Sequence, residues 1–146
     1  MFEALVSLAI GAALLVAVAA AYNATASAME MNDQFFRATQ TARVSINQIM
    51  AEVRACTGGA VEPATLTLTA PGGKVREYRY DSAARRVTMR LLSDAGQPAF
   101  TLVRDVGGAE FRTDGATVSM TLRITIGENQ VTLTGSSTPR RTVTFN

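Results

Sequence analysis

The chain contains no histidine and only one cysteine, Cys56. Without histidine, the most common general base and the most common metal ligand are missing, so Ser-His-Asp triads and most zinc sites are excluded. A single cysteine also excludes an intramolecular disulfide. The place of Cys56 just past a helical segment favours a small buried hydrophobic side chain over a reactive thiol. We therefore expect no enzyme activity and no cofactor.

Charged residues are also scarce, at 18% of the chain with a formal net charge of +2, and Lys74 is the only lysine. This excess of positive charge is too small to indicate a nucleic-acid partner by itself. Nucleic acid is therefore neither excluded nor supported as a partner. Asp81, Asp94, Asp105 and Asp114 lie in turns or at strand ends, where turn chemistry explains them. The segments "DSA" and "SDAG" do not approach the spacing of an EF-hand loop, and we expect no metal site.

Proline is absent from the first 62 residues, and charge is absent from the run Ala4–Tyr22. This run of about 19 residues approaches the roughly 20 that cross a hydrocarbon core. A cleavable signal peptide is an alternative, and "AAAYNATAS" offers small residues that resemble a cleavage site. A signal peptide would also need lysine or arginine before the run, and here Glu3 precedes it. The sequence therefore favours an apolar helix over a removable signal.

Helical sequence continues beyond this run, because residues 23–54 contain neither proline nor glycine. Apolar and small residues recur there at spacings of three and four, which places them on one face of a helix. We expect that face to pack on a folded domain through Phe35, Ile46, Ile49, Met50 and Val53. The helix should cover residues 3–56 and end before Gly58 and Gly59, which are a helix stop signal.

The second half of the chain shows the alternating pattern of β-strands. "ATLTLTA" and "VREYRYD" flank "PGGK", which is a hairpin signature. Further strands are predicted in "RRVTMRLL", "AFTLVRDV", "AEFRTD", "TVSMTLRITI", "QVTLTG" and "RRTVTFN", with Gly107 and Gly108 separating the second and third of these runs. Together they predict one antiparallel, mostly meander-connected sheet whose apolar face the helix covers, and an arginine-rich opposite face that is a solvated surface rather than a binding site.

The predicted fold class is thus α+β, with a long N-terminal helix whose apolar half protrudes and whose amphipathic half packs on an antiparallel sheet. Residues 1–24 are expected to form the hydrophobic half of the helix, which suits a membrane or a filament core. Residues 25–56 form the amphipathic half, and residues 57–146 form the sheet domain.

This layout resembles the type IV pilin and pseudopilin family. The resemblance rests on "FEALVSLAIGAALLVAVAAAY", which is similar to the mature N-terminus of that family, where a glutamate lies within an otherwise hydrophobic helix. Weaker similarity in the order of elements comes from "QTARVSINQIMAEVRAC", "REYRYDSAARRVTMRL" and "FTLVRDVGGAEFR". The family glutamate is usually fifth in the mature chain, after a positively charged leader, whereas here it is third. A helix proline and a C-terminal cysteine pair, both usual in the family, are absent from this sequence.

The resemblance implies a role for Glu3 and for the residues around it. In the family, the glutamate is thought to meet the N-terminal amine of a neighbouring subunit, which here implies pairing of Glu3 with a Met1 amine that the family methylates. A carboxylate at mid-bilayer costs about 2.5–3.5 kcal/mol, so it is kept where a partner compensates it. The implied assembly residues are Met1, Phe2, Glu3, Leu5, Leu8 and Gly11, with Gly11 as a weak point of the helix. The alternative is that Glu3 lies in the headgroup region without a partner.

Three functional classes follow. The first is a structural subunit of a pilus-like extracellular filament, a helical homo-oligomer bundled through its N-terminal helices. The second is a minor pilin or pseudopilin of a secretion or DNA-uptake system. The third is a single-pass membrane protein with an extracytoplasmic binding domain. The resemblance implies an inner-membrane assembly platform and a prepilin peptidase as partners. It also implies residence in the inner membrane before assembly, and in a pilus or periplasmic pseudopilus afterwards.

Overall fold

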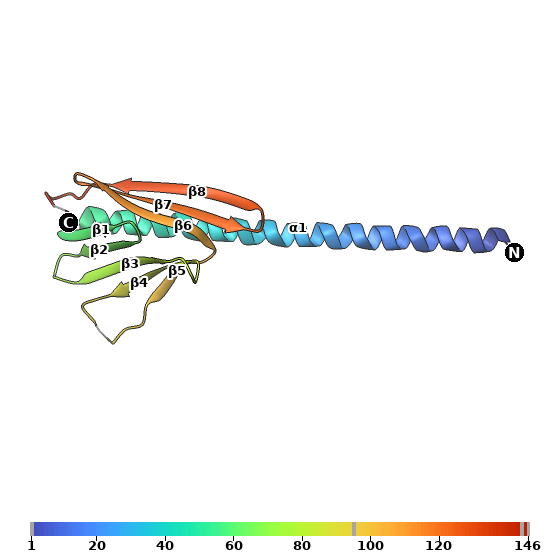
Figure 1. The fold of residues 1–146 in the computed structure, drawn as a ribbon, viewed down its shortest axis with the longest axis horizontal. Helices are drawn as coiled ribbons and strands as arrows, with labels where there is room; N and C mark the ends of the chain where they lie inside the picture. The colour runs from blue at the N-terminus through green and yellow to red at the C-terminus, as the bar shows by residue number, and fades with distance from the viewer. Residues whose placement is uncertain (1, 95, 144, 146) are drawn as a thin grey trace. The chain divides into compact units, whose positions relative to one another are not determined.

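The computed structural model describes residues 2–94, 96–143 and 145 of the chain. Within them, one long helix precedes two antiparallel sheets, so the expected α+β class is confirmed (Figure 1). In chain order the elements are α1 (Phe2–Ala55), β1 (Gly58–Glu62), β2 (Thr65–Thr69), β3 (Val75–Asp81), β4 (Arg86–Leu91), β5 (Phe100–Val103), β6 (Val106–Asp114), β7 (Thr117–Ile126) and β8 (Asn129–Ser137). The chain divides into two compact units, Met1–Gln34 and Phe35–Asn146.

The helix α1 forms because residues 2–55 contain no proline and only one glycine, Gly11. Glu3 lies in its first turn and Arg54 in its last, and both charges are favourable at those ends of the helix dipole. The helix ends where the amide of Cys56 donates to the Val53 carbonyl at 3.4 Å and the glycines follow. These observed ends lie one residue before each of the predicted ends, at 3 and 56.

The first sheet is a meander in the order β1-β2-β3-β4-β5, with every neighbouring pair antiparallel. The predicted hairpin between β2 and β3 is present. Its turn is closed by the amide of Ala70 donating to the Lys74 carbonyl at 2.8 Å, and by that of Gly73 donating to the Ala70 carbonyl at 3.1 Å. Gly72 and Gly73 both have positive φ, which explains why glycine occupies these two positions. Lys74 is exposed at the end of this turn.

The second sheet has the order β6-β7-β8 and is also antiparallel. The register shifts between Val106 and Gly108, so Gly107 is an extra residue in β6. A Cβ at Gly107 would lie 2.5 Å from the Thr125 hydroxyl, so a larger residue at this β-bulge would require Thr125 to shift.

The core of the second unit combines the C-terminal part of α1 with the inner faces of both sheets. From the helix it takes Ala42, Ile46, Ile49, Met50 and Val53, all buried. From the strands it takes Leu66, Leu68, Tyr78, Val87, Val103, Val106, Phe111, Val118, Met120, Leu122 and Ile124. The helix comes so close to β8 that a Cβ at Gly135 would collide with Ile46 and lie 3.2 Å from Met50.

Four details of the strands differ from the sequence-based expectations. The strands form two sheets, because the chain leaves the first sheet after β5 and begins the second at β6. Strand β1 was not predicted, since it begins with two glycines, which disfavour strands in general. Gly107 and Gly108 lie inside β6 rather than between strands. In the predicted last strand, residues 140–143 are not a strand, and Phe145 makes only one isolated parallel bridge to Gly59.

Candidate functional site

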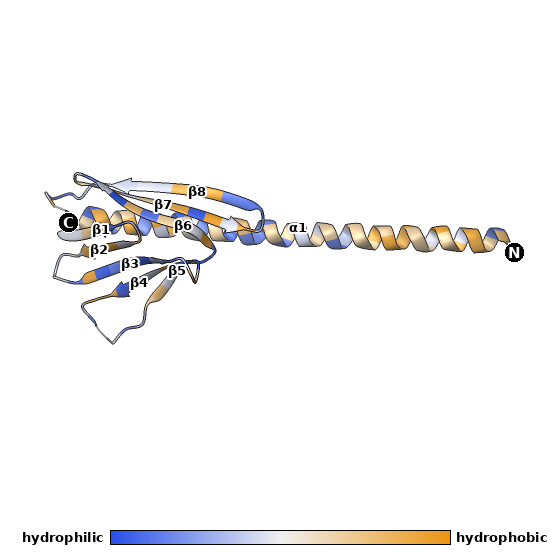
Figure 2. Ribbon diagram, viewed as in Figure 1, coloured by the Kyte–Doolittle hydropathy of each residue, from blue (hydrophilic) through white to orange (hydrophobic). Residues whose placement is uncertain are grey.

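The residues predicted to act in assembly lie on an exposed apolar surface of the first unit. Phe2, Leu5 and Leu8 are exposed, and Gly11 is half-buried. From residue 2 to residue 34 no side chain is buried. Figure 2 shows the hydrophobic colouring along this part of α1, from the N-terminal end onward. Met1, the remaining predicted assembly residue, lies outside the described residues.

By length and composition, α1 can cross a membrane. Its apolar run, Ala4–Tyr22, corresponds to about 29 Å of helix at 1.5 Å per residue, close to the thickness of a hydrocarbon core. Apolar side chains surround the axis in this run. Either lipid or other apolar helices must therefore cover them.

Glu3 is the only charged residue among the first 29. Its carboxylate is exposed in the first turn of α1, where the helix dipole favours negative charge. No hydrogen bond or ion pair within the described residues engages it. A carboxylate at the edge of an apolar surface is stabilised when a cation from another molecule approaches it, because removing both charges from water together costs less than removing one.

The residues predicted to join the helix to the sheets lie in the second unit. Ile46, Ile49, Met50 and Val53 are buried in its core, whereas Phe35 is only half-buried. The four buried side chains fix the helix on the sheets through apolar contact.

A polar cluster next to these residues was not predicted from the sequence. The Tyr78 hydroxyl on β3 donates to Oε2 of Glu52 at 2.6 Å, and Arg76 lies 2.6 Å from the other carboxylate oxygen. Glu52 lies off the apolar stripe of the helix, so the sequence pattern indicated only a charged side chain exposed to solvent. Burial and the Glu52 carboxylate raise the pKa of Tyr78, and the hydrogen bond to Glu52 raises the pKa of Arg76. The cluster ties α1 to the first sheet with a partly buried, charge-assisted hydrogen bond.

Cys56 is buried beside this cluster, as its position predicts. Burial raises the pKa of its thiol, which keeps the thiol protonated at neutral pH. Its surroundings therefore suit packing rather than nucleophilic chemistry.

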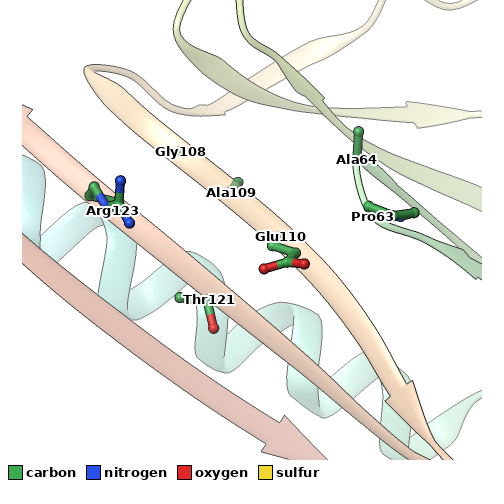
Figure 3. A pocket seen from close by; sticks show the side chains of 7 residues that line it. All are labelled: Pro63, Ala64, Gly108, Ala109, Glu110, Thr121 and Arg123. Carbon is green, nitrogen blue, oxygen red and sulfur yellow. The ribbon is translucent and has the colours of Figure 1, made fainter.

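A hollow of about 360 Å³ opens on the second unit (Figure 3). Figure 3 shows Glu110 on β6 beside Thr121 and Arg123 on β7, facing a turn formed by Pro63 and Ala64. Glu110 accepts from the Arg112 guanidinium at 2.8 Å. Arg123 makes no ion pair with any described residue. The volume of the hollow lies within the range of small-ligand pockets.

The described residues include no group of three or more histidine, cysteine, aspartate or glutamate side chains placed to hold a metal ion. Comparison with family models, with curated proteins and with solved structures finds no match to this chain. Its long apolar N-terminal helix and its antiparallel sheets, on which the C-terminal part of that helix packs, form a pilin-like architecture.

Proposed function

We propose that the chain is the structural subunit of a type IV pilus-like filament, held in the inner membrane before assembly. The observation that carries this proposal is the exposed apolar surface of residues 2–22, with the carboxylate of Glu3 in its first turn. In the filament, neighbouring N-terminal helices bundle, and Glu3 pairs with the N-terminal amine of the next subunit.

The helices gain by bundling because every apolar side chain that leaves water contributes about 25 cal/mol per Å² of buried apolar surface. Apolar contact alone has little directional preference. The Glu3 carboxylate adds that preference, because a wrong register leaves a charge unpaired next to apolar surface. Pairing with an amine thus selects one register from the many that apolar contact permits.

The second unit supports the proposal by having a core of its own. Among the described residues, the buried hydrophobic ones all lie between Ala42 and Val143. A subunit with such a domain folds before assembly, so that bundling of the helices requires no refolding of the sheets. An assembly platform and a prepilin peptidase in the inner membrane would be its partners before assembly.

The test compares Glu3→Ala with Glu30→Ala, which removes another exposed carboxylate from the same helix. Both variants should reach the membrane and keep the circular dichroism spectrum of the wild type. We expect Glu3→Ala to lower the yield of sheared fibres at least about tenfold, equivalent to about 1.4 kcal/mol, and Glu30→Ala to leave it unchanged. Normal fibre yield from Glu3→Ala would overturn the pairing role. Absence of this chain from any fibre of the source cells would overturn the filament itself.

A second candidate is a single-pass membrane protein with an extracytoplasmic binding domain. The hollow beside Arg123 favours it, because the Arg123 guanidinium is paired with no described carboxylate, whereas Glu110 in the same lining is paired with Arg112, so Arg123 suits a small anionic group. Under this candidate the wild-type chain stays in the membrane fraction and enters no fibre. A minor pilin or pseudopilin would instead be found in fibres at a small fraction of their main subunit.

A further inference from the structure

The first unit carries one column of large apolar side chains at a spacing of seven residues. The column consists of Leu8, Leu15, Tyr22 and Met29, which are 73%, 72%, 74% and 69% exposed. Because seven residues complete nearly two turns of an α-helix, these four side chains lie above one another on a single face. We call this face the heptad column.

The spacing distinguishes this face from the rest of the apolar helix. Between residues 4 and 29 the other large apolar side chains are Leu5, Val6, Ile10, Leu14, Val16 and Val18. Each of these six occupies a different heptad position, so no second column forms. A lipid environment imposes no seven-residue period, whereas packing against another helix does.

The column also continues where the sequence has become polar. Asn23, Thr25, Ser27 and Glu30 surround Tyr22 and Met29. Met29, seven residues beyond the apolar run that ends at Tyr22, gains nothing there from the hydrocarbon core of a membrane. Its exposure is explained when another protein surface covers it.

Small residues border the column between its large ones. Ala12, Ala19 and Ala26 each follow a member of the column by four residues, so large and small side chains alternate along this face. Small residues let two helix backbones approach closely, which is how helices associate in membranes. At the levels between the large side chains, the alanines therefore let the backbones of two copies of this face approach each other closely.

We propose that the heptad column pairs with the heptad column of a second copy, forming a parallel, in-register helix dimer in the membrane. The pair is parallel because both copies cross the membrane in the same direction, and this is the one point that rests on the proposed function. Identical residues then meet at each level, with Met29 facing Met29 of the other copy. This dimer is a state of the subunit before assembly, and it forms whether or not a filament follows.

The test uses one engineered cysteine per chain, with Cys56→Ala removing the buried native thiol. Met29→Cys places a thiol on the column. Met31→Cys replaces the same residue type two positions later, about 200° around the helix. Both full-length variants are oxidised with copper phenanthroline in native membranes, and the dimer is measured on non-reducing gels. Labelling with a maleimide after denaturation gives the total thiol in each sample.

We expect Met29→Cys to yield at least about tenfold more disulfide dimer than Met31→Cys, because a disulfide requires the two Cα atoms to lie within about 7 Å. Equal yields, or more dimer from Met31→Cys, would overturn the proposal. Fibres that form from a chain giving no Met29→Cys dimer would overturn the column and leave the filament standing. A Met29→Cys dimer from a chain that enters no fibre would support the column and count against the filament.

Discussion

Tyr78 is a fully buried side chain whose one polar atom meets a carboxylate from another element. Its hydroxyl lies 2.6 Å from Glu52, whereas the hydroxyl of Tyr80, two residues later, lies 3.3 Å from the backbone carbonyl of Val106. A hydrogen bond to a charged acceptor is worth more than one to a neutral carbonyl. The two tyrosines therefore form a matched pair in the same strand.

Tyr78→Phe should lower the free energy of unfolding by about 2 kcal/mol, because Glu52 loses a charge-assisted hydrogen bond that is partly shielded from solvent. Tyr80→Phe should lower it by about 1 kcal/mol or less. Urea unfolding of the full chain in detergent, followed by near-ultraviolet circular dichroism, measures both values.

The difference in stability between the wild type and Tyr78→Phe should also shrink as the pH rises above about 10. The reason is that burial raises the pKa of Tyr78, so the unfolded chain releases this proton first and binds fewer protons than the folded chain.

Equal losses from the two variants would show that the hydrogen bond from Tyr78 to Glu52 contributes no more to stability than the one from Tyr80 to the neutral Val106 carbonyl. A difference that stays constant through the alkaline range would show that Tyr78 ionises as readily in the folded chain as in the unfolded one.

The helix α1 changes its surroundings along its length, and the second unit contains both environments on one helix. Val53 is fully buried against the sheets, whereas Val44, nine residues earlier, is 65% exposed. The same substitution at these two valines separates packing on the sheets from any effect on the helix itself.

Val53→Asp should destabilise the second unit by at least about 3 kcal/mol, because it places an unpaired carboxylate in an apolar core. Val44→Asp should change the stability by less than about 0.5 kcal/mol, since the new charge stays in solvent. Ile46→Asp and Ile49→Asp should behave like Val53→Asp. Thermal unfolding of the full chain in detergent provides the measurement, and an unchanged melting temperature for Val53→Asp would show that the helix does not pack on the sheets through this face.

The sequence patterns account for most elements because their periods are clear. The helix follows from the absence of proline and the stripe through Ile49, and β2 to β4 follow from strict alternation around "PGGK". The pattern does not reveal β1, where pairing of Gly58 and Gly59 with β2 overrides a poor strand propensity. It also does not reveal the division into two sheets, since alternation states which residues face inward and not which strands pair. Glu52 was missed for a related reason, because its partner Tyr78 is supplied by the tertiary fold.

The two units differ in how far their apolar side chains are exposed to solvent. The second unit buries its apolar side chains between its own helix segment and its sheets, and the first unit leaves its apolar side chains for another molecule or a membrane to cover. Under the proposed function, stability and assembly therefore depend on different parts of the chain.

A chain of residues 35–146 alone should fold in water without detergent, because the core lies within those residues. We expect its melting temperature to lie within about 5 °C of that of the full chain in detergent, since a larger shift would correspond to about 1 kcal/mol or more. The full chain should aggregate when detergent is removed. A shortened chain that unfolds non-cooperatively would show that residues before Phe35 contribute to the core.

The turn between β2 and β3 would report the spacing of subunits in the proposed filament. Lys74 is exposed there and is the only lysine of the chain. Any bond that an amine-reactive reagent makes between two lysines must therefore join two separate copies. A series of such reagents of increasing length would measure the distance between the Lys74 residues of neighbouring copies. The product to detect by mass spectrometry is a single cross-linked peptide that contains two copies of Lys74.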